Sequence, residues 1–157
     1  MRAVRRATVA DAPELTRLRE ILLAEMGQDV TQPTWRAAAL AAFTERLAPG
    51  RDLTAFVIDA EQGRLAASAV GTIFDSLPGP NRPDGRTGWL LNLATAPEFR
   101  GRGYARATST ALLDWFHGQG VRRVEILAST AGEALAKSLG FTEPAAVSLT
   151  WAQDRRL

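Results

Sequence analysis

Cysteine is absent from the 157-residue sequence, which excludes disulfides, thiolate metal sites and a cysteine nucleophile, and is compatible with a reducing cytoplasm. No stretch reaches the roughly 18 to 20 consecutive apolar residues that a membrane-spanning helix needs. Charged Arg2, Arg5 and Arg6 stand near the N-terminus without the apolar segment of a secretory signal. We therefore expect a soluble cytoplasmic protein with no membrane partner.

Lysine and histidine are scarce: Lys137 is the only lysine and His117 the only histidine. The net charge is +2, and no basic run is interleaved with aromatic residues, so we expect no nucleic-acid partner. His117 lies near the end of an expected helix, where a cationic imidazole interacts favourably with the helix dipole. This structural role is favoured over a metal or catalytic one, and we expect no metal site.

Hydrophobic residues make up 46% of the chain, which is enough for a single α/β domain over residues 1–157. Apolar residues recur at helical spacing in four segments, and β-favouring runs lie between them. The expected helices are residues 11–26, 34–47, 103–119 and 131–139. The expected strands are a short one around Val4 and residues 54–59, 64–74, 89–95, 121–128 and 147–151. Prolines and glycines at 77–88 predict a mobile loop near a substrate cleft.

Residues 100–106 read Arg-Gly-Arg-Gly-Tyr-Ala-Arg and lie between an expected buried strand and a long helix. Backbone N–H groups at the start of a helix face outward at its positive end and bind phosphate oxygens. Glycine lets the backbone come close to a ligand, and arginine adds a charge that does not titrate. The turn therefore predicts a phosphate-bearing ligand, unless the glycines only cap elements and the arginines are solvated.

Two familiar phosphate motifs do not fit this turn. A P-loop requires Gly-Lys-Ser/Thr, but Gly103 is followed by Tyr104 and Ala105. A dinucleotide fingerprint that starts at Gly101 requires glycine or alanine where Arg106 stands. The turn therefore belongs to another phosphate-binding class.

The turn resembles the acyl-CoA signature of the GNAT superfamily of N-acyltransferases, in which Gln or Arg is followed by x-x-Gly-x-Gly/Ala. Arg100, Gly103 and Ala105 match it. Two further segments are similar to the family: residues 92–99 resemble its fourth strand with a proline-containing exit, and residues 128–141 resemble its C-terminal motif. Residues 4–18 resemble its first strand and helix, so the resemblance covers nearly the whole chain.

The resemblance implies a mixed central sheet of about six to seven strands, splayed between strands four and five and flanked by about four helices. The pantetheine arm of acetyl-CoA is expected along the backbone of strand four, and the pyrophosphate on the amides of the turn. A serine stands at position 129, where many members have an asparagine that contacts CoA. The expected acetyl-CoA residues are Leu93, Ala94, Thr95, Arg100, Gly101, Arg102, Gly103, Tyr104, Ala105, Arg106 and Ser129.

The expected catalytic groups depart from the family. Its usual tyrosine acid follows the leucine of the C-terminal motif, and here Ala136 follows Leu135. The catalytic residues are therefore left unassigned, and Ser129, Glu125 and Tyr104 are weak candidates. Strand four has no carboxylate base and offers only Asn92 and Thr95. Two hypotheses stay open: an active N-acetyltransferase, and a non-catalytic acyl-CoA-binding sensor that has lost its acid.

For the enzyme, the resemblance implies direct attack of an amine on acetyl-CoA in a ternary complex, without a metal or a covalent intermediate. The acceptor is expected to be a small-molecule amine or a peptide or protein amine, and a homodimer is common in the family. Asp75 and Asp84 could attract a cationic amine, or they are simply solvated. Trp35, Phe43 and Trp89 could line the acceptor pocket, although core packing explains them equally well.

Overall fold

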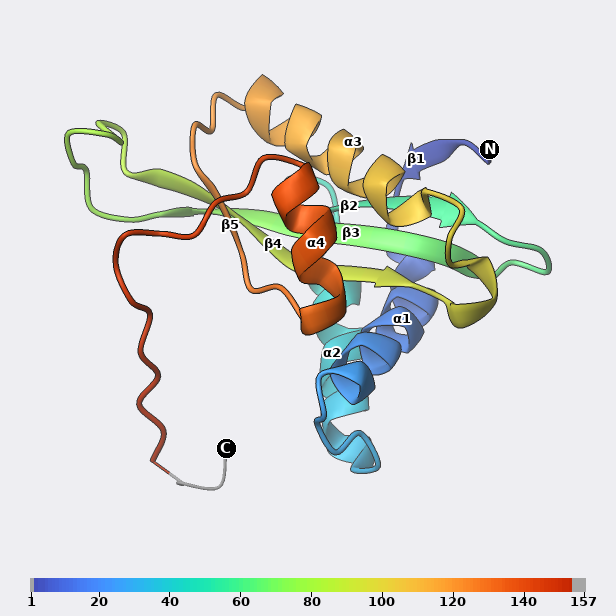
Figure 1. Ribbon diagram of the computed structural model, residues 1–157. Coiled ribbons are helices and arrows are strands. Elements are labelled where there is room, and N and C mark those ends of the chain that lie inside the picture. Colours follow the sequence, from blue (N-terminus) through green and yellow to red (C-terminus); the bar gives the residue numbers. More distant parts are fainter. Residues whose placement is uncertain (1, 154–157) are drawn as a thin grey trace.

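A five-stranded mixed sheet forms the centre of the computed structural model, which describes residues 2–153 (Figure 1). The strands follow one another across the sheet in chain order, from β1 at one edge to β5 at the other. The first four pair antiparallel, and β5 pairs parallel to β4. The strands are β1 (Val4–Arg6), β2 (Leu53–Asp59), β3 (Leu65–Asp75), β4 (Arg86–Thr95) and β5 (Val124–Ile126).

Helices cover both faces of the sheet, and Figure 1 shows α3 on the face opposite to α1 and α2. Prolines in the first turns of α1 and α2 suit positions where a backbone N–H has no helical partner. The helices are α1 (Ala12–Glu25), α2 (Pro33–Arg46), α3 (Tyr104–Gly118) and α4 (Thr130–Ser138). Two 3-10 turns, Val9–Asp11 and Pro97–Phe99, precede α1 and the glycine-rich turn.

The core has one layer on each side of the sheet. Leu15 and Leu18 of α1 are fully buried against β2, β3 and β4. On the other face, Phe116 of α3 is fully buried over two glycines. A Cβ at Gly71 or Gly88 would come within 2.7 or 2.8 Å of the Phe116 ring, far inside van der Waals contact. These strand glycines therefore let α3 lie close to the sheet.

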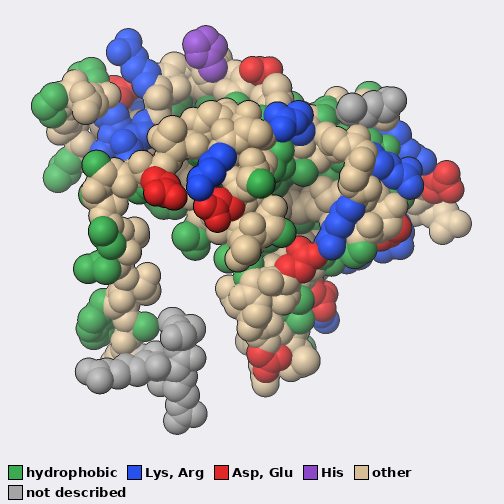
Figure 2. Space-filling model, in the orientation of Figure 1, with side chains coloured by type: hydrophobic (Ala, Val, Ile, Leu, Met, Phe, Trp, Pro, Cys, Tyr) green, Lys and Arg blue, Asp and Glu red, His purple; other side chains and the backbone are tan. Residues whose placement is uncertain are grey.

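The expected helices and the first four strands are confirmed, but the expectation of six to seven strands is wrong. Residues 147–151 form no strand in the described part of the chain, and the strand expected at 121–128 is reduced to β5. Val147, Leu149 and Trp151 have the alternation of a strand, yet they are 83%, 88% and 84% exposed. A strand exists only with a neighbour to pair with, and this segment runs away from the sheet with its hydrophobic side chains uncovered (Figures 1 and 2).

The loop expected at 77–88 is shorter, because Arg86, Thr87 and Gly88 continue the β3–β4 ladder opposite residues 73–75. The remaining turn is closed by a hydrogen bond from the Ser76 N–H to the Gly85 carbonyl, 2.8 Å long. It forms the outer end of a long hairpin that projects beyond the sheet in Figure 1.

Within residues 2–153, no helix is long and apolar enough to cross a membrane.

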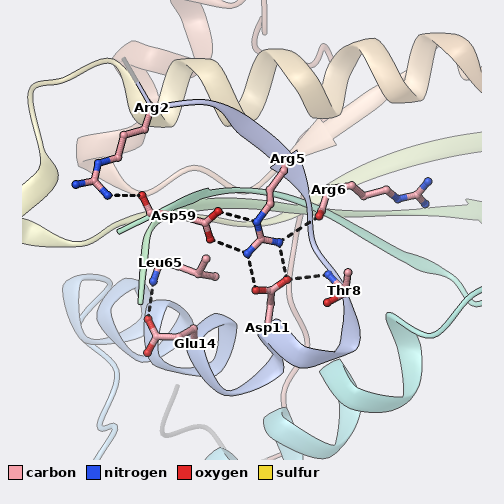
Figure 3. Close-up of polar contacts among 8 residues, drawn as sticks. All are labelled: Arg2, Arg5, Arg6, Thr8, Asp11, Glu14, Asp59 and Leu65. Carbon is pink, nitrogen blue, oxygen red and sulfur yellow. Dashed lines mark hydrogen bonds and ion pairs between the residues drawn. The ribbon is translucent and has the colours of Figure 1, made fainter. Parts of the chain in front are cut away.

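Arg5 joins three elements at the N-terminal edge of the sheet (Figure 3). Its guanidinium donates to both carboxylate oxygens of Asp59 at 2.7 and 2.8 Å, and to both of Asp11 at 2.9 Å. Asp11 also accepts the Thr8 N–H at 2.8 Å. Hydrogen bonds from Arg5 hold the pKa values of Asp11 and Asp59 below their usual range. The cluster fixes β1, β2 and the start of α1 relative to one another.

Candidate functional site

The sheet opens between β4 and β5. Their ladder runs only from the Gly88–Val124 pair to the Leu90–Ile126 pair, while β4 continues to Thr95. A β-bulge lies at the point of separation, because Leu90 pairs with Gly71 and Asn92 with Val70, which leaves Leu91 as an extra residue. Bulges of this kind bend a strand and redirect its side chains, and they are frequent beside active sites. The implied splay between strands four and five is therefore present.

A cavity of about 180 Å³, which we call the gap cavity, occupies this opening. The second half of β4 forms one wall, the segment after β5 and the start of α4 form another, and the end of α1 closes it. It is lined mostly by apolar side chains. The lining includes Leu22, Glu25, Leu91, Leu93, Ala94, Thr95, Ile126, Leu127, Ala128, Ser129, Gly132 and Leu135.

The glycine-rich turn bounds a second cavity of about 230 Å³, the turn cavity. Gly101 and Gly103 adopt left-handed backbone angles, with φ of 73° and 76°, which glycine allows without strain. Gly103 is the N-cap of α3 and has no side chain to cap the helix, so the first N–H groups of α3 lack a side-chain partner. Thr95, Arg100, Ala105 and Leu135 line both cavities, so the two adjoin, and we call them together the groove.

Three arginines of the turn are held by the surrounding protein. Arg100 forms an ion pair with Glu25 at the end of α1 and donates to the Thr95 carbonyl at 3.3 Å. The Arg106 guanidinium donates to the Ser138 hydroxyl of α4 at 2.6 Å. Arg102 donates to the Glu98 carbonyl at 3.3 Å. All three lie on the surface around the start of α3, where the helix dipole adds to their positive potential.

The groove collects ten of the eleven residues expected to bind acetyl-CoA, and only Arg102 lies outside the lining. The signature residues, the strand-four residues and Ser129 therefore share one surface, although they come from three separate segments. The arrangement fits an extended ligand with an apolar arm between β4 and β5 and an anionic end at the start of α3.

The three weak catalytic candidates lie in different environments. The Ser129 hydroxyl lines the gap cavity and accepts the Gly132 N–H at 3.1 Å as the N-cap of α4, so its proton is free to be donated. Glu125 pairs with Arg123 at 2.8 Å and lines neither the gap cavity nor the turn cavity. Tyr104 is 6% exposed, and its ring stacks on Phe99. Of the three, only Ser129 faces the opening between β4 and β5.

Ala136, at the position of the expected tyrosine acid, is 4% exposed. It lines neither the gap cavity nor the turn cavity, whereas its neighbour Leu135 lines both. Residue 136 therefore neither supplies an acid nor faces the groove.

A larger cavity of about 810 Å³, the helix cavity, lies between α1, α2 and the middle of β4. The small side chains of Ala38, Ala39 and Ala42 on α2 leave much of this space open. Leu91 at the bulge lines both the helix cavity and the gap cavity, so the two meet there. The lining also includes Arg19, Leu23, Asp29, Val30, Trp35, Phe43, Arg46 and Asn92.

Only some of the residues proposed for an acceptor pocket line this cavity. Trp35 and Phe43 line it, whereas Trp89 packs against Phe74 with ring centroids 6.2 Å apart. Asp75 and Asp84 lie at the outer end of the β3–β4 hairpin and line neither the helix cavity nor the groove. An acceptor in the helix cavity would therefore meet the tryptophan and phenylalanine of α2 but neither aspartate.

Sequence reasoning missed Arg19, a half-buried residue of α1 in the wall of the helix cavity. Its guanidinium donates to the Asn92 side-chain carbonyl at 3.3 Å, and burial lowers its pKa. Arg19 follows Leu15 by four residues and precedes Leu22 by three, which places a charge beside the apolar stripe of α1. A charged residue beside an apolar helix stripe was therefore the feature of the sequence from which Arg19 could have been identified. Nothing local in the sequence marked Leu91, because the bulge depends on the pairing with β3.

Comparisons with known proteins agree with this geometry. A family model described as the acetyltransferase (GNAT) family matches residues 15–141. A search of curated proteins gives no match. A predicted acetyltransferase from Clostridium acetobutylicum, solved with acetyl-CoA, has a TM-score of 0.84 at 23% identity, with 96% of both chains covered.

Two further solved structures share the fold. A GCN5-related N-acetyltransferase from Ralstonia eutropha JMP134 has a TM-score of 0.80 at 22% identity, with 96% of this chain and 99% of that chain covered. The aminoglycoside N-acetyltransferase AAC(6')-Iy in complex with CoA has a TM-score of 0.75 at 21% identity, with 98% and 96% covered. Enzymes of the GNAT family use acetyl-CoA as a co-substrate. Because the family model spans most of its length, the chain belongs to the GNAT family of acetyltransferases.

Proposed function

We propose that the protein is an N-acetyltransferase that transfers an acetyl group from acetyl-CoA to a primary amine in a ternary complex. The observation that carries this proposal is the meeting of two cavities at Leu91. The groove on one side of this residue has the shape and charge for acetyl-CoA. The helix cavity on the other side has room for a separate acceptor. Two substrates held against each other need no covalent enzyme intermediate.

Acetyl-CoA occupies the groove in this proposal. Its pyrophosphate oxygens accept hydrogen bonds from the backbone N–H groups of residues 101–106, next to the Arg100 and Arg106 side chains. Its pantetheine arm lies along Leu93, Ala94 and Thr95, whose outer backbone groups have no strand beside them in the described structure. The thioester then lies near the bulge at Leu91, where the acceptor enters from the helix cavity.

In the reaction, the neutral amine nitrogen attacks the thioester carbonyl, a C–N bond forms and the C–S bond breaks. The amine loses one proton and the thiolate of CoA leaves. A lysine-like amine with a pKa of about 10.4 is mostly protonated at neutral pH, so its proton must first pass to water or to a base. The thiolate, with a thiol pKa on the order of 8.5, is a moderate leaving group. The Ser129 hydroxyl is one of two hydroxyls in the gap cavity, with that of Thr95, that could protonate it.

Obstructing the junction tests this proposal directly. Leu91→Trp should fill the space where the cavities meet, so that turnover on any accepted amine falls by at least about tenfold, as for a misplaced attacking group. Acetyl-CoA binding, measured by calorimetry, should change much less, because the turn and most of the groove are intact. Leu77→Trp is the control, since Leu77 is 86% exposed on the hairpin turn. Equal activity of the Leu91→Trp variant and the control would contradict the ternary-complex geometry.

A non-catalytic acyl-CoA sensor is the second candidate, and Ala136 is the observation that favours it. A panel of amines with a thiol-release assay separates the two functions. Acetyl-CoA-dependent thermal stabilisation shows in parallel that the protein is folded and binds its ligand. Sustained turnover on any amine would exclude the sensor. Stabilisation without turnover on the whole panel would favour it.

A further inference from the structure

We propose that the acceptor carries a carboxylate, and that Arg19 binds this carboxylate in the helix cavity. The inference rests on the proposed function and narrows its substrate class. It assigns the acceptor to amino acids or short peptides, and it excludes purely cationic amines as preferred substrates. Four observations support it: the unpaired charge of Arg19, the pairing of the other arginines nearby, the contact with Asn92 and the apolar remainder of the cavity.

Arg19 is half-buried, and within residues 2–153 no carboxylate pairs with it. Removing a cation from water is costly unless an anion or several hydrogen bonds replace the lost hydration. Burial accordingly lowers the pKa of Arg19. A carboxylate ligand in the cavity would supply the missing partner.

Neighbouring arginines already have their anions. Arg17 on the same helix pairs with Glu14 at 2.8 Å, and Arg36 on α2 pairs with Glu20. Arg46, the other arginine in the wall of the helix cavity, pairs with Asp52. Of the arginines in the wall of the helix cavity, Arg19 is therefore the one without a carboxylate partner in the described structure. A planar guanidinium with free N–H groups is well suited to bind a carboxylate through two parallel hydrogen bonds.

Asn92 positions this guanidinium. Its side-chain carbonyl accepts one Arg19 N–H at 3.3 Å, while its amide nitrogen is buried and has no hydrogen-bond partner in the described structure. Buried amide groups without partners are rare in folded proteins and call for an explanation. Asn92 directly follows Leu91 at the bulge, so it ties the Arg19 charge to the place where the two cavities meet. A ligand held by Arg19 is thus near the junction.

The rest of the lining is suited to an apolar group. Leu23, Val30, Trp35 and Phe43 contribute hydrophobic surface, and the alanines of α2 leave room. The carboxylate that lines the cavity, Asp29, is exposed and accepts the N–H and hydroxyl of Thr31 at 3.0 and 2.6 Å. At about 810 Å³ the cavity is large enough for an amino acid or a short peptide with a hydrophobic side chain.

Matched pairs of acceptors test the inference. Each pair differs only in the carboxylate: L-leucine and L-leucinamide, L-phenylalanine and its amide, leucyl-leucine and its amide, with spermidine as a cation without a carboxylate. The measured quantity is the ratio of kcat/KM for acid over amide. Comparing this ratio between wild type and variants cancels the different basicities of the amines. Free amino acids and dipeptides form separate arms, which distinguish the two sources of the carboxylate.

The wild type should prefer the acids, and Arg19→Gln should lower the acid-over-amide ratio by about 10- to 100-fold, the effect of losing a charged hydrogen bond. Arg19→Lys should recover part of the ratio, because it keeps the charge without the planar fork. Arg51→Gln is the matched control, since Arg51 pairs with Glu45 at 2.6 Å on the exposed surface and lies outside the helix cavity. An unchanged ratio in Arg19→Gln, or a wild-type preference for spermidine, would overturn the inference.

Binding measurements keep the inference separate from the proposed function. Calorimetry of the same acids and amides on the protein saturated with CoA needs no turnover. If no amine is acetylated but the acids bind more tightly than the amides, and Arg19→Gln abolishes that difference, the carboxylate site stands and the enzymatic proposal fails. If acids and amides bind equally, or neither binds, the carboxylate site is wrong whatever the activity.

Discussion

Arg5 of β1 and Arg19 of α1 have opposite environments. Arg5 is surrounded by four carboxylate oxygens, from Asp11 and Asp59, and joins β1, β2 and α1 (Figure 3). Arg19 has one neutral partner, Asn92, and faces a cavity. The first guanidinium has its hydrogen-bonding capacity used within the fold, and the second retains it. The difference separates a charge that stabilises the protein from one that is available to a ligand.

The largest expected effect comes from giving Arg19 the kind of partner that Arg5 has. Asn92→Asp adds a carboxylate next to the Arg19 guanidinium, so the kcat/KM for carboxylate-bearing acceptors should fall by about 10- to 100-fold, the scale of one charged hydrogen bond. Steady-state kinetics on the acid and amide pairs measures this. An unchanged preference would mean that Asn92 and Arg19 do not act together on the acceptor.

Arg5→Gln removes the cation from the cluster that Arg5 forms with Asp11 and Asp59. We expect the free energy of unfolding to fall by about 1 to 2 kcal/mol, because Asp11 loses a charged hydrogen bond while solvent screens the more exposed Asp59. Urea denaturation at neutral pH measures the change. The acid-over-amide ratio should remain as in wild type. A loss of acceptor preference in this variant would show that the two arginines are not separate in role.

The same cluster predicts a pH dependence. Arg5 lowers the folded-state pKa values of Asp11 and Asp59, so their contribution to stability is present above their unfolded pKa of about 4 and is lost as pH falls through the folded values. Denaturation of the wild type should therefore become easier below that pH. The Arg5→Gln variant should show a shallower decline over the same range. Parallel curves for the two proteins would contradict this role.

The smallest expected effect is that of Arg19→Gln on stability. Because no carboxylate partner is lost, the free energy of unfolding should change by less than about 0.5 kcal/mol, or rise slightly as a poorly solvated charge is removed. Urea denaturation beside Arg5→Gln gives the comparison. A loss as large as that of Arg5→Gln would mean that Arg19 has a structural role, and the contrast between the arginines would fail.

Local sequence patterns predicted the four helices, the β2–β3 hairpin and the glycine-rich turn before α3, because each depends on residues close together in the chain. The resemblance to the GNAT family followed from three such segments. Gly101 and Gly103 of the turn have left-handed backbone angles, which a residue without a Cβ adopts freely. The failed prediction at residues 147–151 shows the limit. Its alternation is that of a strand, but a strand also needs a neighbour.

The sequence by itself therefore determined the family, the helices and the glycine-rich turn before α3. The tertiary structure decided which openings and which partners lie next to those residues. The opening between β4 and β5 depends on where their ladder stops, and the bulge at Leu91 depends on the register with β3. Whether an arginine is paired or free depends on side chains far away in the chain, as Arg5 and Arg19 illustrate. Charge can be read from a sequence, but the partner of a charge is a property of the fold.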